Sequence, residues 1–258
     1  MKVVILAGGF GTRIRDVAEN IPKPLIPIGS YPILWHIMKY YASYGHTEFI
    51  ICLGHKGNEI RDFFINYKPF TTDFTIDFSN QNIQFHSSHN EHDWKITLAE
   101  TGKNTMTGAR IAQIQKYIGD DDFFLTYGDG LGDINIDDLT TFHKSHGKTL
   151  TVSGVRPPGR FGEITTDKAG FATGFNEKPQ TSGGRISGGY FIAKPEIFNY
   201  LSTDPDLLFE QQPMKQLVKD KQLLVFNHDG FWQPMDTSRE FKLLNELFDR
   251  GEAPWVVW

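Results

Sequence analysis

The hydrophobic pattern of the first part of the chain predicts buried strands that alternate with helices. Residues 3–7 form an unbroken apolar run that ends at a double glycine, and residues 49–53 form a second such run. Runs of this kind are typical of strands buried on both faces of a parallel sheet. Apolar residues at helical spacing follow each run, over 32–41 and over 60–67. This order of strand, helix, strand and helix predicts an α/β fold with a mostly parallel sheet and helical crossovers.

The middle of the chain has a different pattern, because apolar and polar residues alternate there one by one. Such alternation predicts short, half-exposed strands, inserted into the α/β pattern, over 74–78, 83–86 and 95–98. A helix over 111–118 and a third buried strand over 122–127 come next.

The last third of the chain returns to mixed strands and helices. Strands are predicted near 150–155, 163–166 and 190–193, and helices near 214–218 and 241–248. The sequence contains no internal repeat, no low-complexity run and no linker. We therefore expect a single domain over 1–258, in which the last third folds back onto the first part.

Charge and composition exclude several classes of protein. The net charge of −5 argues against nucleic-acid binding, which requires a broad basic surface. No apolar run approaches the roughly 20 residues of a membrane span, and the N-terminus does not resemble a signal peptide. The single cysteine, Cys52, lies in a buried strand and is interpreted as a core thiol rather than a nucleophile. We expect a soluble, cytoplasmic protein without a membrane partner.

A glycine-rich segment directly after the first strand is the first candidate for chemistry. Gly8, Gly9 and Gly11 allow the backbone to approach a ligand, and successive N–H groups can bind phosphate oxygens. Arg13 adds a bidentate phosphate donor, and Lys23 lies between two prolines that restrict its backbone. The alternative is a tight turn with an incidental surface arginine. The spacing matches neither a P-loop nor a dinucleotide-binding fingerprint.

Two aspartates are candidates for a metal site. Asp129 follows a buried strand, and ligands of open α/β sheets bind at the carboxyl ends of strands. Asp236 precedes a predicted helix. Two carboxylates together with phosphate oxygens suit Mg²⁺. As alternatives, Asp129 could be a turn residue and Asp236 a helix N-cap, whereas the acidic run over 120–122 is interpreted as a solvated turn at the far end of the sheet.

The segment Leu6-Ala7-Gly8-Gly9-x-Gly11-Thr12-Arg13, together with Lys23-Pro24, resembles the signature of the sugar-nucleotide pyrophosphorylases. The resemblance implies a Rossmann-like α/β core with helices on both faces of the sheet. It also implies that Arg13, Lys23 and Asp129 are catalytic and that Asp129 and Asp236 hold Mg²⁺. The implied nucleotide-binding residues are Leu6, Ala7, Gly8, Gly9, Gly11, Thr12, Arg13, Lys23, Thr105, Arg110 and Gly128.

Within this family the whole chain is similar to the glucose-1-phosphate cytidylyltransferases. The similarity runs through 32–38, 107–110, 157–162, 232–237 and 253–255. It implies CTP and a sugar 1-phosphate as substrates, with nucleotide binding over about 1–130 and sugar-phosphate binding over about 131–258. It also implies a homo-oligomer, for which a hexamer is the candidate form. The implied sugar-phosphate-binding residues are Gly162, Glu177, Lys178 and Gly188.

One residue departs from this family pattern. Many relatives carry Asn where this chain has Ser187, which is shorter and has no amide group. The assignment of glucose is weaker for this reason, because a contact to a sugar hydroxyl is either lost or made through water. For Arg110 the alternative is a surface residue on an amphipathic helix. His86, His89 and His92 are spaced by three but lie outside a helix, so we do not expect a metal cluster there.

The expected reaction is in-line attack of a sugar-phosphate oxygen on the α-phosphorus of CTP, with pyrophosphate as the leaving group. Alternatives are a nucleotidyltransferase for another NTP or another phosphorylated acceptor, and a non-catalytic protein that binds nucleotide sugars.

Overall fold

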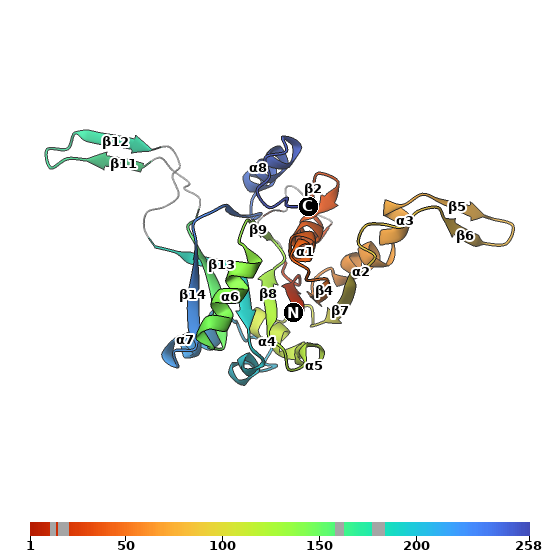
Figure 1. Ribbon diagram of the computed structural model, residues 1–258, viewed down its shortest axis with the longest axis horizontal. Coiled ribbons are helices and arrows are strands. Elements are labelled where there is room, and N and C mark those ends of the chain that lie inside the picture. Colours follow the sequence, from red (N-terminus) through yellow and green to blue (C-terminus); the bar gives the residue numbers. More distant parts are fainter. Residues whose placement is uncertain (11–13, 15–20, 158–162, 177–183) are drawn as a thin grey trace.

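The computed structural model describes residues 1–10, 14, 21–157, 163–176 and 184–258, and its centre is a seven-stranded sheet (Figure 1). The strand order across the sheet is β14-β10-β13-β8-β1-β4-β7. These strands are β1 (Val3–Leu6), β4 (Glu48–Leu53), β7 (Lys95–Glu100), β8 (Phe123–Tyr127), β10 (Leu150–Val155), β13 (Ile186–Ala193) and β14 (Leu223–His228).

The sheet is mostly parallel, as the hydrophobic pattern predicts. β1 pairs in parallel with β4 on one side and with β8 on the other, so that Leu6 lies opposite both Cys52 and Tyr127. β13 runs antiparallel to its neighbours β8 and β10. The strands β1, β4 and β8 therefore end at the same edge of the sheet, where their loops form the site described below.

Helices cover both faces of the sheet, as predicted. Alternate residues of β1 point to opposite faces: Val3 and Ile5 contribute to one hydrophobic core, and Val4 and Leu6 to the other. The first core receives apolar side chains from α1 (Ile33–Ser43), α2 (Gly57–Ile65), α6 (Ile136–His146) and α8 (Ser238–Asp249). The second receives them from α4 (Thr107–Gln113), α5 (Gln115–Ile118), η3 (Pro195–Tyr200) and α7 (Gln212–Lys219).

Two antiparallel hairpins extend from the body of the molecule on opposite sides (Figure 1). One follows α3 (Tyr67–Thr71) and pairs β5 (Phe74–Asp77) with β6 (Asn82–Phe85). The other pairs β11 (Glu163–Thr166) with β12 (Ala172–Asn176). The first hairpin confirms the expected insertion over 74–78 and 83–86, whereas of the second hairpin the sequence predicts only the strand over 163–166.

The expectation for residues 95–98 is wrong, because β7 belongs to the central sheet. It pairs in parallel with β4, and Ile51 lies opposite Leu98. β7 is an edge strand, partly exposed along most of its length, and such a strand shows the same alternation as an inserted hairpin.

One smaller expectation also needs correction. The helix predicted over 111–118 is two helices, since α4 ends at Gln113 and α5 begins at Gln115. Trp255 near the C-terminus is buried, stacks on Phe231 and donates its indole N–H to His36 Nδ1 at 3.3 Å. The C-terminal tail therefore packs into the first hydrophobic core.

Four short strands outside the central sheet complete the fold. They are β2 (Pro27–Ile28), β3 (Tyr31–Pro32), β9 (Gly130–Gly132) and β15 (Trp232–Pro234). In the part of the chain that the structure describes, none of the helices is both long and apolar enough to cross a membrane.

Candidate active site

A pocket of about 380 Å³ lies at the carboxyl ends of β1 and β8. The structure brings many of the residues singled out from the sequence to its wall. These are Leu6, Ala7, Gly8, Gly9, Lys23, Thr105, Arg110, Gly128, Asp129 and Asp236. Their positions agree with one common site, and the role of each residue stays a prediction.

Of the remaining predicted residues, Gly188 alone is among those that the structure describes. Gly11, Thr12, Arg13, Gly162, Glu177 and Lys178 lie outside the described residues. Gly188 is described and lies buried in β13, where its carbonyl accepts a hydrogen bond from Trp232 Nε1 at 2.7 Å. The hydroxyl of the neighbouring Ser187 accepts a hydrogen bond from the Gly189 N–H group at 3.3 Å.

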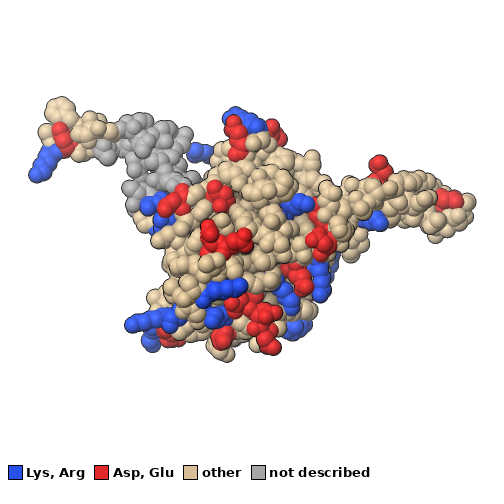
Figure 2. Space-filling view, viewed as in Figure 1, with Lys and Arg blue, Asp and Glu red and all other residues tan. Residues whose placement is uncertain are grey.

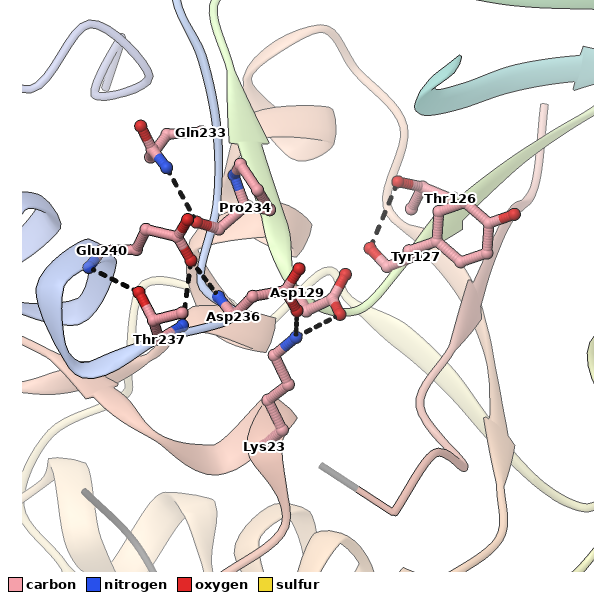
Figure 3. A network of polar contacts seen from close by, with 9 residues as sticks. All are labelled: Lys23, Thr126, Tyr127, Asp129, Gln233, Pro234, Asp236, Thr237 and Glu240. Atoms are coloured by element: carbon pink, nitrogen blue, oxygen red, sulfur yellow. Dashed lines mark hydrogen bonds and ion pairs between the residues drawn. The ribbon is translucent and has the colours of Figure 1, made fainter. Parts of the chain in front are cut away.

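Lys23, Asp129 and Asp236 all line the pocket, and their side chains converge (Figure 3). Lys23 Nζ lies 2.6 Å from Asp129 Oδ2 and 2.5 Å from Asp236 Oδ1. The lysine side chain is mostly buried, whereas about a third of each carboxylate side chain is exposed to solvent. Both carboxylates thus contact the same ammonium group.

Pairing of two short strands explains why these aspartates meet. Asp129 occupies the turn between β8 and β9, and Asp236 follows β15. β9 and β15 are antiparallel partners, with Gly130 opposite Pro234. The Met235 N–H group also donates to the Asp129 carbonyl at 2.9 Å, so the backbone fixes the two aspartates beside each other.

The alternative that Asp236 is only a helix N-cap is wrong. Thr237 is the N-cap of α8, and its hydroxyl accepts the N–H group of Glu240 in a capping box. The Glu240 carboxylate accepts the N–H groups of Asp236 and Thr237 at 2.7 and 2.9 Å. Because the cap is made by its neighbours, the Asp236 carboxylate can point toward Lys23.

The position of Lys23 follows from the local sequence. It is the first residue of a 3-10 turn, η2 (Lys23–Leu25), and its neighbours in the chain are Pro22 and Pro24. Burial opposes the charge on Lys23, but Asp129 and Asp236 outweigh that effect and raise the pKa of the lysine above its ordinary value. Lys23 is therefore a fixed cation at neutral pH.

The carboxylates of Asp129 and Asp236 are a suitable donor set for a divalent ion. Mg²⁺ takes one or two carboxylates and completes its coordination with phosphate oxygens and water. Within the described residues no group of three or more His, Cys, Asp or Glu side chains forms a metal site supplied by the protein alone. The pair of aspartates therefore fits an ion that is held jointly with a phosphorylated ligand.

Arg110 lies beneath the glycine loop, and the alternative of a surface arginine is wrong. It is buried, and its guanidinium donates to the carbonyl oxygens of Leu53, Gly102 and Gly8 at 2.8, 2.8 and 3.1 Å. Burial lowers the pKa of Arg110. A Cβ atom at Gly8 would lie 2.4 Å from the guanidinium carbon, so the contact requires glycine at this position.

Seven described residues of the pocket wall were not among the predicted site residues: Phe10, Ile14, Pro24, Asn104, Met106, Thr107 and Tyr127. Asn104 and Met106 belong to the segment before α4, and Tyr127 is the last residue of β8. Asn104 and Met106 lay in a polar segment of which only Thr105 and Arg110 were singled out. Tyr127 resembled one more core residue of a buried strand, so no local signal could have identified it.

The other candidates for chemistry lie away from the pocket. Asp121 and Asp122 line a depression at the opposite end of the sheet, beside Met1 and Lys2, as expected for the acidic turn. The Cys52 thiol is buried, and burial raises its pKa to about 12, which agrees with a core thiol. Among the described residues, none of the histidines belongs to a cluster that could hold a metal.

Comparison with known proteins identifies the family of the chain. The family model for nucleotidyl transferases matches residues 2–237. The chain belongs to the nucleotidyl transferase family. The pocket that contains Lys23, Asp129 and Asp236 is thus the candidate active site of a nucleotidyltransferase.

Individual relatives of this nucleotidyltransferase match over their whole length. It is 43% identical to the glucose-1-phosphate cytidylyltransferases of Salmonella typhimurium and Salmonella typhi, and each alignment covers all of both chains. Its fold is similar to that of a UDP-glucose pyrophosphorylase crystallised with UDP-glucose, with a TM-score of 0.65 and 16% identity over 97% of this chain and 98% of the other.

Proposed function

We propose that this nucleotidyltransferase transfers CMP from CTP to α-D-glucose 1-phosphate and forms CDP-glucose and pyrophosphate. The observation that carries the proposal is the convergence of Lys23, Asp129 and Asp236 in the pocket. Such a group suits a reaction in which two polyanions must be brought together. The choice of CTP and glucose 1-phosphate is supported by the end-to-end similarity to glucose-1-phosphate cytidylyltransferases.

In this proposal Asp129 and Asp236 hold Mg²⁺. When bound, the ion neutralises phosphate charge and stabilises the charge that develops on the leaving pyrophosphate. Lys23 takes part in the same proposed step, because its ammonium group already contacts both carboxylates. It donates hydrogen bonds to phosphate oxygens and counters their repulsion.

The chemical step requires no general base from the protein. The second pKa of a phosphate monoester is about 6, so the attacking oxygen of glucose 1-phosphate is already ionised at neutral pH. That oxygen forms a bond to the α-phosphorus of CTP, and the bond from the α-phosphorus to the bridging oxygen of pyrophosphate breaks. The protein contributes alignment and charge neutralisation, with Arg13 and Lys178 as further predicted cations.

The two substrates occupy different parts of the chain in this proposal. Leu6, Gly8, Gly9 and Gly128 border the nucleotide phosphates, and Thr105 and Arg110 lie on the nucleotide side of the pocket. The remaining nucleotide and sugar-phosphate residues are those expected from the sequence. The division into a nucleotide part over about 1–130 and a sugar-phosphate part over about 131–258 is part of the same proposal.

The test is a substrate panel with pyrophosphate detection. The purified protein is incubated with each NTP and with several sugar 1-phosphates, with Mg²⁺ and after chelation of divalent ions. The proposal requires the highest kcat/KM for CTP with glucose 1-phosphate, and loss of pyrophosphate release on chelation. Preference for another pair would assign another nucleotidyl transfer, and binding without turnover would point to a regulatory protein.

We also propose that the protein is a homo-oligomer, as expected from the sequence. In the β5–β6 hairpin, Phe74 lies opposite Phe85 and Ile76 opposite Ile83, so these apolar side chains share one face. Half of Ile83 and about two-fifths of Ile76 are exposed, and most of this arm is uncharged in the view of Figure 2. An isolated two-stranded hairpin is marginally stable in water, so a second copy of the chain is the expected cover.

The cytoplasmic location stays a prediction from the sequence.

A further inference from the structure

A loop from the last third of the chain, residues 204–211, fixes the start of α4. The helix begins after Met106 without a side-chain cap, so its first N–H groups need other partners. The Met106 N–H group donates to the Pro205 carbonyl at 2.8 Å, and the Gly108 N–H group donates to the Leu207 carbonyl at 2.9 Å. The pocket wall formed by residues 104–107 therefore depends on this loop for its position.

Glu210, from the same loop, contacts two walls of the pocket at once. The Thr107 hydroxyl donates to Glu210 Oε2 at 2.7 Å, and the Tyr127 hydroxyl donates to Glu210 Oε1. Thr107 Oγ1 in turn accepts the Phe209 N–H group at 3.0 Å. Thr107 and Tyr127 line the pocket, whereas Glu210 does not, so Glu210 can act only through them.

Both hydroxyl groups are constant donors at neutral pH. Burial, and then the charge of Glu210, raise the pKa of Tyr127, so its phenol stays protonated. An ionised carboxylate accepts hydrogen bonds and cannot donate them. Each carboxylate oxygen of Glu210 therefore receives one hydroxyl proton, and the two hydrogen bonds set the separation of Thr107 and Tyr127.

The charge of Glu210 is a disadvantage for the proposed ligand. Among the described residues, Glu210 forms no ion pair with Lys, Arg or His, and it adds a negative charge near a pocket proposed to hold a triphosphate. If charge were its main effect, its removal would improve nucleotide binding. A carboxylate is favoured at this position because it offers two acceptor oxygens to two donors.

We propose that Glu210 is a positioning residue for the nucleobase. It joins the wall over 104–107 to the end of β8, and so determines the width of the part of the pocket in which the base would lie. This inference rests on the proposed nucleotide-binding function of the pocket. It adds a residue outside the pocket wall to those that determine nucleotide affinity.

Steady-state kinetics of Glu210→Gln and Glu210→Ala test this role. The amide keeps the size of the side chain but offers one acceptor oxygen instead of two. We expect KM for CTP to rise by about 10-fold, with kcat and KM for glucose 1-phosphate changed by less than about 2-fold. The matched control is Asp206→Asn, which removes another exposed carboxylate from the same loop. A double-mutant cycle with Tyr127→Phe should give a smaller effect of Glu210→Gln in the Tyr127→Phe background.

Three results would overturn the proposal: an unchanged or lowered KM for CTP, an equal rise of both KM values, or strict additivity with Tyr127→Phe. Failure of the proposed function gives a different result. If the wild-type protein uses another NTP, the same KM comparison is made with that NTP. If it shows no turnover, calorimetric titration with CTP decides, because the variant must then bind the nucleotide about 10-fold more weakly than the wild type.

Discussion

The carboxylates of Asp129 and Asp236 both contact a single ammonium group, that of Lys23, at 2.6 and 2.5 Å. The two aspartates come from distant parts of the chain and meet because β9 pairs with β15. Without a shared cation, two carboxylates in this position would repel each other. The arrangement therefore needs positive charge, which Lys23 supplies in the structure and which Mg²⁺ would increase when bound with a phosphorylated substrate.

Replacement of Asp129 by Asn should abolish most of the activity and leave the fold intact. Asparagine has the same shape and can still accept a hydrogen bond from Lys23, but it lacks the charge that a divalent ion requires. We expect pyrophosphate release to fall by about 10³-fold and the melting temperature to change little. Asp121→Asn is the matched control, because Asp121 is an exposed acid at the other end of β8. Near-normal turnover in Asp129→Asn would contradict the metal assignment.

Replacement of Lys23 by Met should change how stability depends on pH. The pKa of Lys23 is raised above its ordinary value of 10.5 in the folded protein. The charged lysine therefore stabilises the fold fully below about pH 10.5, the pKa of a lysine in an unfolded chain, and this stabilisation is lost as pH rises through the folded-state pKa. We expect Lys23→Met to melt at a lower temperature at pH 8 and to lose less stability than the wild type above pH 10.5.

The same variant tests the metal site without an activity assay. In Lys23→Met the two carboxylates lack their cation, so Mg²⁺ should raise the melting temperature more in the variant than in the wild type. Lys103→Met, which removes an exposed lysine near the pocket, serves as the control. Equal responses of Lys23→Met and the wild type to Mg²⁺ would count against ion binding by Asp129 and Asp236.

Alanine at Gly8 and at Gly9 should have different effects on stability. A Cβ atom at Gly8 would lie 2.4 Å from the guanidinium carbon of Arg110, whereas a Cβ atom at Gly9 has nothing within 4 Å. Arg110 cannot move aside cheaply, because its hydrogen bonds to backbone carbonyls hold it in place. We expect Gly8→Ala to lower the free energy of unfolding by about 1–3 kcal/mol, measured by urea denaturation, and Gly9→Ala to lower it much less. Equal losses would show that the contact with Arg110 does not restrict residue 8.

A charge on the apolar face of the β5–β6 hairpin should reduce the size of the oligomer. Ile83 lies on the face that carries Phe74, Ile76 and Phe85, whereas Gln84 points to the other face. We expect Ile83→Lys to shift the protein to a smaller mass in sedimentation equilibrium, because burying a lysine in an apolar contact is costly. Gln84→Lys is the control and should keep the wild-type mass. The same mass for all three proteins would exclude this face as a subunit contact.

Strands of the central sheet could be predicted where both faces of the strand are buried. β1, β4 and β8 are covered on both faces, so their sequences are continuously apolar and identify them directly. β7 was misassigned because an edge strand alternates in the same way as a separate hairpin. The place of a strand in the sheet depends on pairing with strands far away in the sequence, and that pairing cannot be inferred from the residues of the strand itself.

Candidate residues of the site could be predicted where they belong to a local motif. The glycine turn after β1, the lysine between two prolines and the acid at the end of β8 each follow from neighbouring residues. Glu210 had no such signal, because its importance comes from contacts with Thr107 and Tyr127, which are far from it in the sequence. Arg110 was singled out by resemblance, but its burial beneath Gly8 could not be foreseen.

The sequence by itself determined the α/β class, the buried strands, the glycine loop and the presence of acids suited to a divalent ion. It could do so because these features depend on periodicity and on residues close together along the chain. Only the tertiary structure decided that Asp129 and Asp236 share Lys23, that Arg110 lies beneath the glycine loop and that Glu210 joins two walls of the pocket. Those relationships depend on pairing between β9 and β15 and on packing of the last third against α4, and such long-range contacts leave no pattern in the local sequence.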